Sequence, residues 1–306
     1  MVLIVWYHTN HPTILDYPFY MPTLFFVSGL LLRPIEGRSF VVKKVKRLLI
    51  PFVFFYVVYY IFLLLTNFLK YHSISPDIAW SILDVFKWNV DNDGYVCNYP
   101  LWFIWALLWT LIAANYLVKW VKNDWLLLFI AFLVSTIGYL YIKHLPTPLM
   151  MGRSTSLFVY FVAGYLFKKR NYVEKWKIGL PLSLITFLML YMWNCNIPLI
   201  GVSKTILELM SVSVILLYLS VAIQKSNLLK PLLFFGSNSM VVFGMHDMYL
   251  SILRIITYNI VGKMDVGFGI LNWIMALLMM IPTIYLINRY IPVLAGKRFV
   301  TECCPR

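Results

Sequence analysis

Seven polar side chains of this sequence stand at or inside apolar runs, where an unpaired polar group is costly and usually faces a cavity or a partner. They are His8, Ser28, Arg153, Glu208, His246, Asp247 and Arg254. A neutral imidazole can accept a proton from a hydroxyl near neutral pH. The two histidines in this set therefore make proton transfer the first chemistry to consider.

His8 ends an apolar run that starts at Met1. One interpretation is a general base that takes a proton from a hydroxyl as the hydroxyl attacks a carbonyl. The other is an interfacial histidine that contacts lipid headgroups. His11 follows at a spacing that suits a shared metal ion, but Pro12 opposes a continuing helix and no third ligand is evident. We therefore expect no metal at His8.

His246, Asp247 and Arg254 lie together in a later apolar run. Adjacent residues of a helix point in different directions, so we expect one of His246 and Asp247 to face a cavity and the other a neighbouring helix. Arg254 follows Asp247 by two helical turns. A hydrogen-bond network between helices and a role in binding substrate both remain open for this group. Glu208 stands one residue into its predicted span, where it can reach the interface.

A dense basic cluster, Lys43 to Arg47, precedes another apolar run. Lys43 and Arg47 are four residues apart and share a helix face. Such a pair can bind the phosphates of a donor molecule through charge-assisted hydrogen bonds. The cluster is also typical of an orientation signal and of contact with lipid phosphates.

Ser28 and Trp102 are weaker candidates for residues that line a cavity or bind an acceptor molecule. Ser28 and Gly29 are adjacent small residues, which also favour close packing of helices. Trp102 equally fits a membrane-interface belt or simple packing.

Composition identifies the class of protein. The chain has 306 residues, of which 61% are hydrophobic and 12% charged, with a mean hydropathy of +0.79. A soluble domain is closer to half apolar and a quarter charged, so this chain is predicted to be a polytopic membrane protein. Its net charge of +14 is spread over short loops, which argues against nucleic acid as a partner. The four cysteines show no zinc spacing.

The apolar runs predict an all-α transmembrane bundle in a single integral-membrane domain, residues 1–306. About ten spans are expected, the first lacking its N-terminal half. They cover residues 1–7, 18–32, 48–69, 100–118, 125–142, 154–167, 178–194, 207–223, 238–261 and 268–291. With these spans, 19 of the 26 Lys and Arg residues fall on one side of the membrane and six on the other. The positive-inside rule then makes both termini cytoplasmic.

Five motifs together resemble the membrane-bound acyltransferase 3 family. They are the apolar run that ends at His8, the stretch from Met21-Pro22 to Ser28-Gly29, Lys46-Arg47-Leu48-Leu49-Ile50-Pro51, Pro100-Leu101-Trp102-Phe103, and Phe235-Gly236-Ser237-Asn238-Ser239 leading to His246. Their order and spacing cover almost the whole chain. Tyr20 departs from the family pattern, which often has histidine there, and an arginine of the family pattern would fall before Met1.

The resemblance implies an O-acyltransferase that moves an acyl group, acetyl or succinyl, from cytoplasmic acyl-CoA to a hydroxyl of a cell-surface polysaccharide or glycolipid. It implies His8 as the base, Arg47 with Lys43 at the donor phosphates, and a late histidine at His246. Acyl-CoA is a co-substrate, and no bound cofactor is expected. The expected location is the bacterial inner membrane, among lipids.

Two other functions remain open. A polytopic transporter or flippase of glycan intermediates shares the helical bundle and the intramembrane charges. An inactive, truncated relative that binds a partner is the third possibility, and it rests only on the short first helix.

The predicted orientation can be tested with topology reporters. Reporters fused after Arg47 and after Arg170 should report the cytoplasm, because the basic loops stay inside. A reporter fused at Asn92 should report the outside. An outside signal at Arg47 would contradict the orientation.

Overall fold

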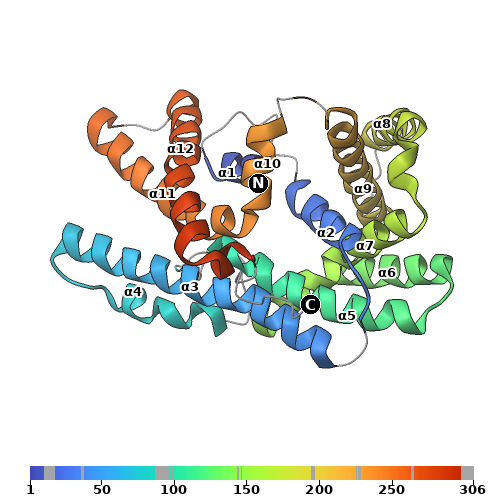
Figure 1. The fold of residues 1–306 in the computed structure, drawn as a ribbon, viewed down its shortest axis with the longest axis horizontal. Helices are drawn as coiled ribbons and strands as arrows, with labels where there is room; N and C mark the ends of the chain where they lie inside the picture. The colour runs from blue at the N-terminus through green and yellow to red at the C-terminus, as the bar shows by residue number, and fades with distance from the viewer. Residues whose placement is uncertain are drawn as a thin grey trace, which may run out of the picture. The chain divides into compact units, whose positions relative to one another are not determined.

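The structure is a computed structural model, and every regular element that it describes is helical (Figure 1). It describes residues 1–9, 18–35, 38–86, 97, 99–142, 145, 147–193, 197–224, 226, 229–262 and 265–297. These ranges contain no strand. The prediction of an all-α fold is therefore confirmed.

The longer helices follow the predicted apolar runs, and short 3-10 helices join several of them. The α-helices are α1 (Val2–Tyr7), α2 (Tyr20–Leu30), α3 (Arg38–Tyr71), α4 (Pro76–Trp80), α5 (Trp102–Trp120), α6 (Asp124–Leu140), α7 (Met151–Lys169), α8 (Trp176–Met192), α9 (Pro198–Ala222), α10 (Leu229–Ser237), α11 (Ser239–Val261) and α12 (Val266–Tyr290). The 3-10 helices are η2 (Ser81–Phe86), η3 (Tyr99–Leu101), η5 (Pro148–Met150), η6 (Tyr172–Lys175) and η7 (Pro292–Ala295).

Five of the described helices are long and apolar enough to cross a membrane: α3 from Phe40, α5, α9, α11 and α12. Two more, α2 and α6, are apolar but shorter. A chain with this many apolar helices is a multi-pass membrane protein. The full number of ten spans stays a prediction.

Two helices, α3 and α9, begin about ten residues earlier than the sequence predicted. Helix α3 begins at Arg38 rather than at residue 48, so the basic cluster forms its first turns. Helix α9 begins at Pro198, a residue that suits the first helical position because it has no N–H to leave unpaired. Glu208 consequently lies well inside α9, with 6% of its surface exposed. Its predicted place at the start of a span was wrong.

The chain forms two compact units. The first unit contains residues 1–17, 42–104 and 230–306. In it, α12 packs against both α11 and α1. Trp273 of α12 donates a hydrogen bond to the Val2 carbonyl over 3.1 Å, and its ring meets Trp6 edge-on with centroids 5.0 Å apart. These contacts fix α1 on α12.

The second unit contains residues 18–41 and 105–229, and in it α7 packs against α2 and α6. Gly29 of α2 faces the Phe161 backbone, and Gly164 of α7 faces the Phe26 backbone, so closely that a Cβ atom at either glycine would overlap it. This is the close approach that small residues permit between membrane helices. For Gly29, the interpretation that a small residue allows close packing of helices is therefore confirmed.

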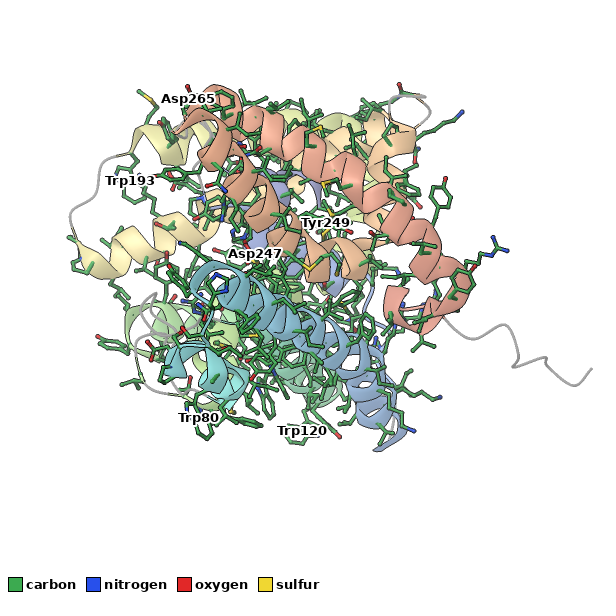
Figure 2. The ribbon with its side chains drawn as sticks, turned by 90° about the vertical axis from the view of Figure 1, so that its left-hand side faces the viewer. Trp80, Trp120, Trp193, Asp247, Tyr249 and Asp265 are labelled. Carbon is green, nitrogen blue, oxygen red and sulfur yellow. The ribbon has the colours of Figure 1, made fainter. Side chains whose placement is uncertain are left out.

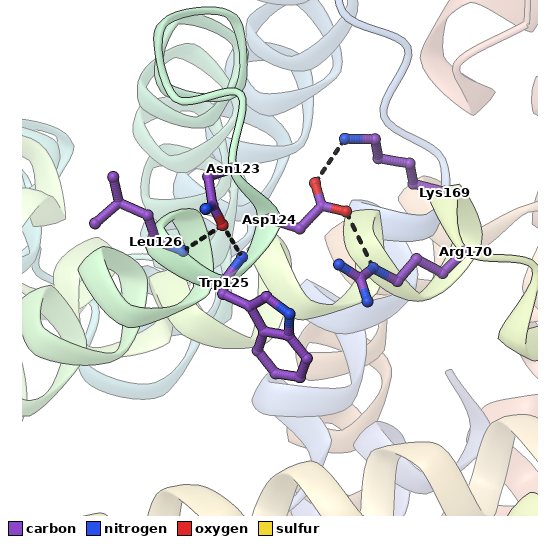
Figure 3. Close-up of polar contacts among 6 residues, drawn as sticks. All are labelled: Asn123, Asp124, Trp125, Leu126, Lys169 and Arg170. Atoms are coloured by element: carbon purple, nitrogen blue, oxygen red, sulfur yellow. Dashed lines mark hydrogen bonds and ion pairs between the residues drawn. The ribbon is translucent and has the colours of Figure 1, made fainter.

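An ion pair joins the end of α7 to the start of α6 in the same unit (Figure 3). Asp124 accepts hydrogen bonds from Lys169 over 2.6 Å and from Arg170 over 3.0 Å. The Lys169 hydrogen bond, with that from Arg170, holds the pKa of the Asp124 carboxyl below its usual range. Asn123 caps α6 by accepting from the backbone N–H groups of Trp125 and Leu126.

Large tryptophans are exposed at several helix ends (Figure 2). Trp80 ends α4, Trp120 ends α5 and Trp193 follows α8. Tryptophan prefers the membrane–water interface because its ring is apolar and its N–H is polar. These positions fit helices that end at such an interface.

The glycine contact in the second unit predicts the effect of one methyl group. Gly164→Ala should lower the free energy of unfolding by about 1–3 kcal/mol, since the added Cβ overlaps the Phe26 carbonyl and the helices must separate. Thermal unfolding in detergent measures the effect. Gly236→Ala in α10 is the matched control, because no atom of the described residues, apart from its chain neighbours and its own helix backbone, lies within 4 Å of a Cβ there, and it should be neutral or stabilising. Equal unfolding midpoints for Gly164→Ala and wild type would contradict the predicted overlap.

Candidate functional site

The end of α1 lies against the middle of α11 in the first unit. The backbone carbonyl of His8, the residue that follows α1, accepts a hydrogen bond from the Arg254 guanidinium of α11. The His8 and His246 rings lie with centroids 5.1 Å apart and planes tilted by 52°. The structure therefore brings His8 together with two other predicted polar residues, His246 and Arg254, which follow it by more than two hundred positions in the sequence.

His246 is fully buried, with 0% of its surface exposed. Its Nδ1 atom lies 3.0 Å from the carbonyl oxygens of both Val242 and Phe243, one turn earlier in α11. A carbonyl only accepts, so Nδ1 carries the hydrogen and donates it, and in a neutral ring Nε2 then carries a lone pair. Nε2 is buried and has no hydrogen-bond partner among the residues that the structure describes.

Asp247 points elsewhere. Its Oδ2 atom accepts a hydrogen bond from the Tyr59 hydroxyl of α3 over 2.7 Å; Figure 2 marks Asp247 on α11. Asp247 therefore contacts a neighbouring helix, as was predicted for one of the two residues, and a cavity at His246 stays a prediction. Sequence reasoning missed Tyr59, because it stands in a run rich in aromatic residues where nothing distinguishes one tyrosine from its neighbours.

A phenylalanine ring lies beside His246. The Phe243 ring lies 5.8 Å from that of His246 and 5.0 Å from that of Phe103. Trp102 precedes Phe103 and is buried at the start of α5. Its role in lining a cavity stays a prediction, but its neighbour Phe103 contacts the phenylalanine that lies beside His246.

Lys43 and Arg47 are both exposed, in the first turns of α3. Twelve residues separate Arg47 from Tyr59 on the same helix, which corresponds to about 18 Å along its axis. Tyr59 in turn contacts Asp247, the neighbour of His246. Helix α3 thus carries the basic cluster at one end and, roughly three turns along, the contact to the histidine region.

Two other residues considered in the sequence analysis, Ser28 and His11, are not placed by this arrangement of α1, α3 and α11. Ser28 is half-buried on α2 in the second unit, and its role stays a prediction. His11, the second member of the metal pair considered with His8, lies outside the described residues.

The fold and this site define a class of protein: a multi-pass helical membrane protein with a histidine pair and a basic helix end. Comparison with family models gives the particular family: a model described as an acyltransferase domain matches residues 1–289. The chain belongs to the acyltransferase 3 family. Comparison with curated proteins and with solved structures gives no match.

The Tyr59–Asp247 hydrogen bond predicts energetic coupling between α3 and α11. In a double-mutant cycle of Tyr59→Phe and Asp247→Ala, the coupling energy should be about 0.5–3 kcal/mol, because each single change removes the same contact. Unfolding in detergent measures it. Tyr60→Phe is the matched control: Tyr60 bonds the Ala79 carbonyl instead, so its effect should add to that of Asp247→Ala. Additive effects for Tyr59→Phe would contradict the predicted coupling.

Proposed function

We propose that this protein is an O-acyltransferase that moves an acyl group, acetyl or succinyl, from cytoplasmic acyl-CoA to a hydroxyl of a cell-surface polysaccharide or glycolipid. Membership of the acyltransferase 3 family supports acyl transfer as the reaction. The observation that carries the proposal for the site is the contact between His8 and the buried His246.

In the proposed reaction His8 is the general base. Its imidazole accepts the proton of the acceptor hydroxyl while the hydroxyl oxygen bonds to the thioester carbonyl carbon. The tetrahedral intermediate collapses as the carbon–sulfur bond breaks, and the bonding electrons leave with the sulfur of CoA. The departing thiolate takes the proton from His8, which returns the ring to its neutral form. The products are an ester and free CoA.

Lys43 and Arg47 are proposed to hold the phosphates of acyl-CoA at the cytoplasmic face. Both are exposed and four residues apart on α3, so two cations can reach one anionic group. The distance of about 18 Å along α3 from Arg47 to Tyr59 leaves room for an extended CoA arm between the phosphates and the thioester. This arrangement separates binding of the donor from the chemical step.

The proposed setting is the bacterial inner membrane, with about ten spans and both termini in the cytoplasm. The excess of Lys and Arg on one side supports the orientation. His8 then lies towards the outer face, where the acceptor glycan would arrive. Trp102 and His246, both in the first unit, are proposed to line the path between the two substrates.

The proposal predicts that turnover needs His8. Membranes that carry the wild-type protein should transfer label from radiolabelled acetyl-CoA or succinyl-CoA to polysaccharide or glycolipid. His8→Ala should lower the rate by about 10²–10⁴-fold, because the hydroxyl loses its base. His72→Ala, which removes an exposed histidine at the end of α3, is the control and should leave the rate unchanged. No labelling by wild type with either donor would favour a transporter or an inactive relative.

The donor site makes a separate prediction. Arg47→Ala should raise the KM for acyl-CoA by about tenfold, as expected for the loss of a charge-assisted hydrogen bond to phosphate. The KM for the acceptor should not change. Lys70→Ala is a matched control, since Lys70 is an exposed cation at the opposite end of α3. A larger effect on the acceptor than on acyl-CoA would overturn the assignment.

A further inference from the structure

We propose that His246 is a positioning residue that accepts a hydrogen bond from the His8 ring through Nε2 and thereby fixes which nitrogen of His8 acts as the base. The inference rests on the proposed function, because it assigns His246 a task only if His8 accepts the proton. In this inference His246 does not bind substrate directly. It acts through its contact with the His8 side chain.

The first argument is the state of the His246 ring. Both carbonyl oxygens near Nδ1, those of Val242 and Phe243, can only accept, and each lies 3.0 Å away. The hydrogen is therefore on Nδ1, and the helix backbone itself selects this tautomer. Nε2 is left as a buried acceptor without a partner among the described residues, and the Phe243 ring lies 5.8 Å from the His246 ring. A buried acceptor without a donor costs about 1–3 kcal/mol, so a nearby donor would be stabilising.

The second argument is proximity. The His8 and His246 rings lie beside each other, with centroids 5.1 Å apart. At this separation a rotation of the His8 side chain brings a ring N–H within hydrogen-bond reach of Nε2. Hydrogen bonds of catalytic groups often shorten only when substrate is bound.

The third argument is that the backbone of His8 is already held. Its carbonyl accepts from Arg254, and α1 is fixed on α12 through Trp273. With the backbone held, the orientation of the His8 ring depends only on its side-chain torsion angles. Asp247, the neighbour of His246 in sequence, accepts a hydrogen bond from Tyr59 of α3, so it is not taken as the partner that competes with Nε2 for the His8 N–H.

The consequence for the reaction is a defined tautomer of His8. The nitrogen that faces His246 carries the hydrogen, and the opposite nitrogen keeps its lone pair for the acceptor hydroxyl. When His8 accepts that proton, the bond to Nε2 becomes charge-assisted and strengthens. His246 would thus favour the protonated intermediate without touching substrate.

The direct test is the tautomer of His8, read from 15N chemical shifts of the full-length protein in lipid bilayers. The chain has five histidines, so 15N-histidine labelling gives a spectrum in which His8→Gln assigns the His8 signals. Wild type should show one protonated and one unprotonated ring nitrogen at His8. His246→Phe should convert these to the averaged signals of a tautomer mixture, whereas His246→Gln, whose side-chain carbonyl can still accept, should retain them. Unchanged His8 signals in His246→Phe would overturn the inference.

Kinetics provide the second readout. His246→Phe should lower kcat by about 10–100-fold with both KM values unchanged, and His246→Gln should recover part of the loss. In a His8→Ala background, His246→Phe should cause no further loss, because the residue acts only through His8. A raised KM for the acceptor, or a loss that persists without His8, would show that His246 contacts substrate and would overturn the inference. Because the spectrum needs no turnover, a wild type without acyl transfer would contradict the proposed function while the tautomer test still decides the histidine contact.

Discussion

The pairing of the two histidines depends on one contact above all, the hydrogen bond from the Arg254 guanidinium to the backbone carbonyl of His8. A charged group inside a membrane helix is costly unless it finds a partner, and a carbonyl at the end of a short helix has no partner within that helix. Each group satisfies the other. The contact joins residues 246 positions apart and holds the His8 ring beside His246.

Helix α3 links this histidine region to the basic cluster. It is one helix from Arg38 to Tyr71, so Lys43, Arg47 and Tyr59 keep fixed spacings. Tyr59 binds Asp247, and Phe55, one turn earlier, packs against Gly244 of α11. A continuous helix of this kind suits a protein whose donor molecule binds at one end of a path and reacts further along it. The second unit follows different packing rules, in which glycines bring the α2 and α7 backbones together.

Periodicity and composition predicted much of the fold, because apolar runs in lipid have only helices open to them. They failed where a helix extends into polar sequence: α3 takes in the basic cluster, and α9 starts at Pro198 and draws Glu208 inside. For the site, spacing on one helix indicated that His246 and Asp247 diverge, but a single sequence could not pair His8 with Arg254 or Asp247 with Tyr59. Those contacts depend on which helices pack together, and that is a long-range property.

Vectorial transfer is the most direct test of the account, because donor cations and acceptor base are assigned to opposite faces. Sealed inverted membrane vesicles expose the cytoplasmic face, and right-side-out vesicles expose the other. Radiolabelled acetyl-CoA or succinyl-CoA added outside should label glycan in inverted vesicles, but in right-side-out vesicles only after permeabilisation. Vesicles with His8→Ala should stay unlabelled in both orientations. Equal labelling of intact vesicles in both orientations, or labelling that survives His8→Ala, would contradict the account.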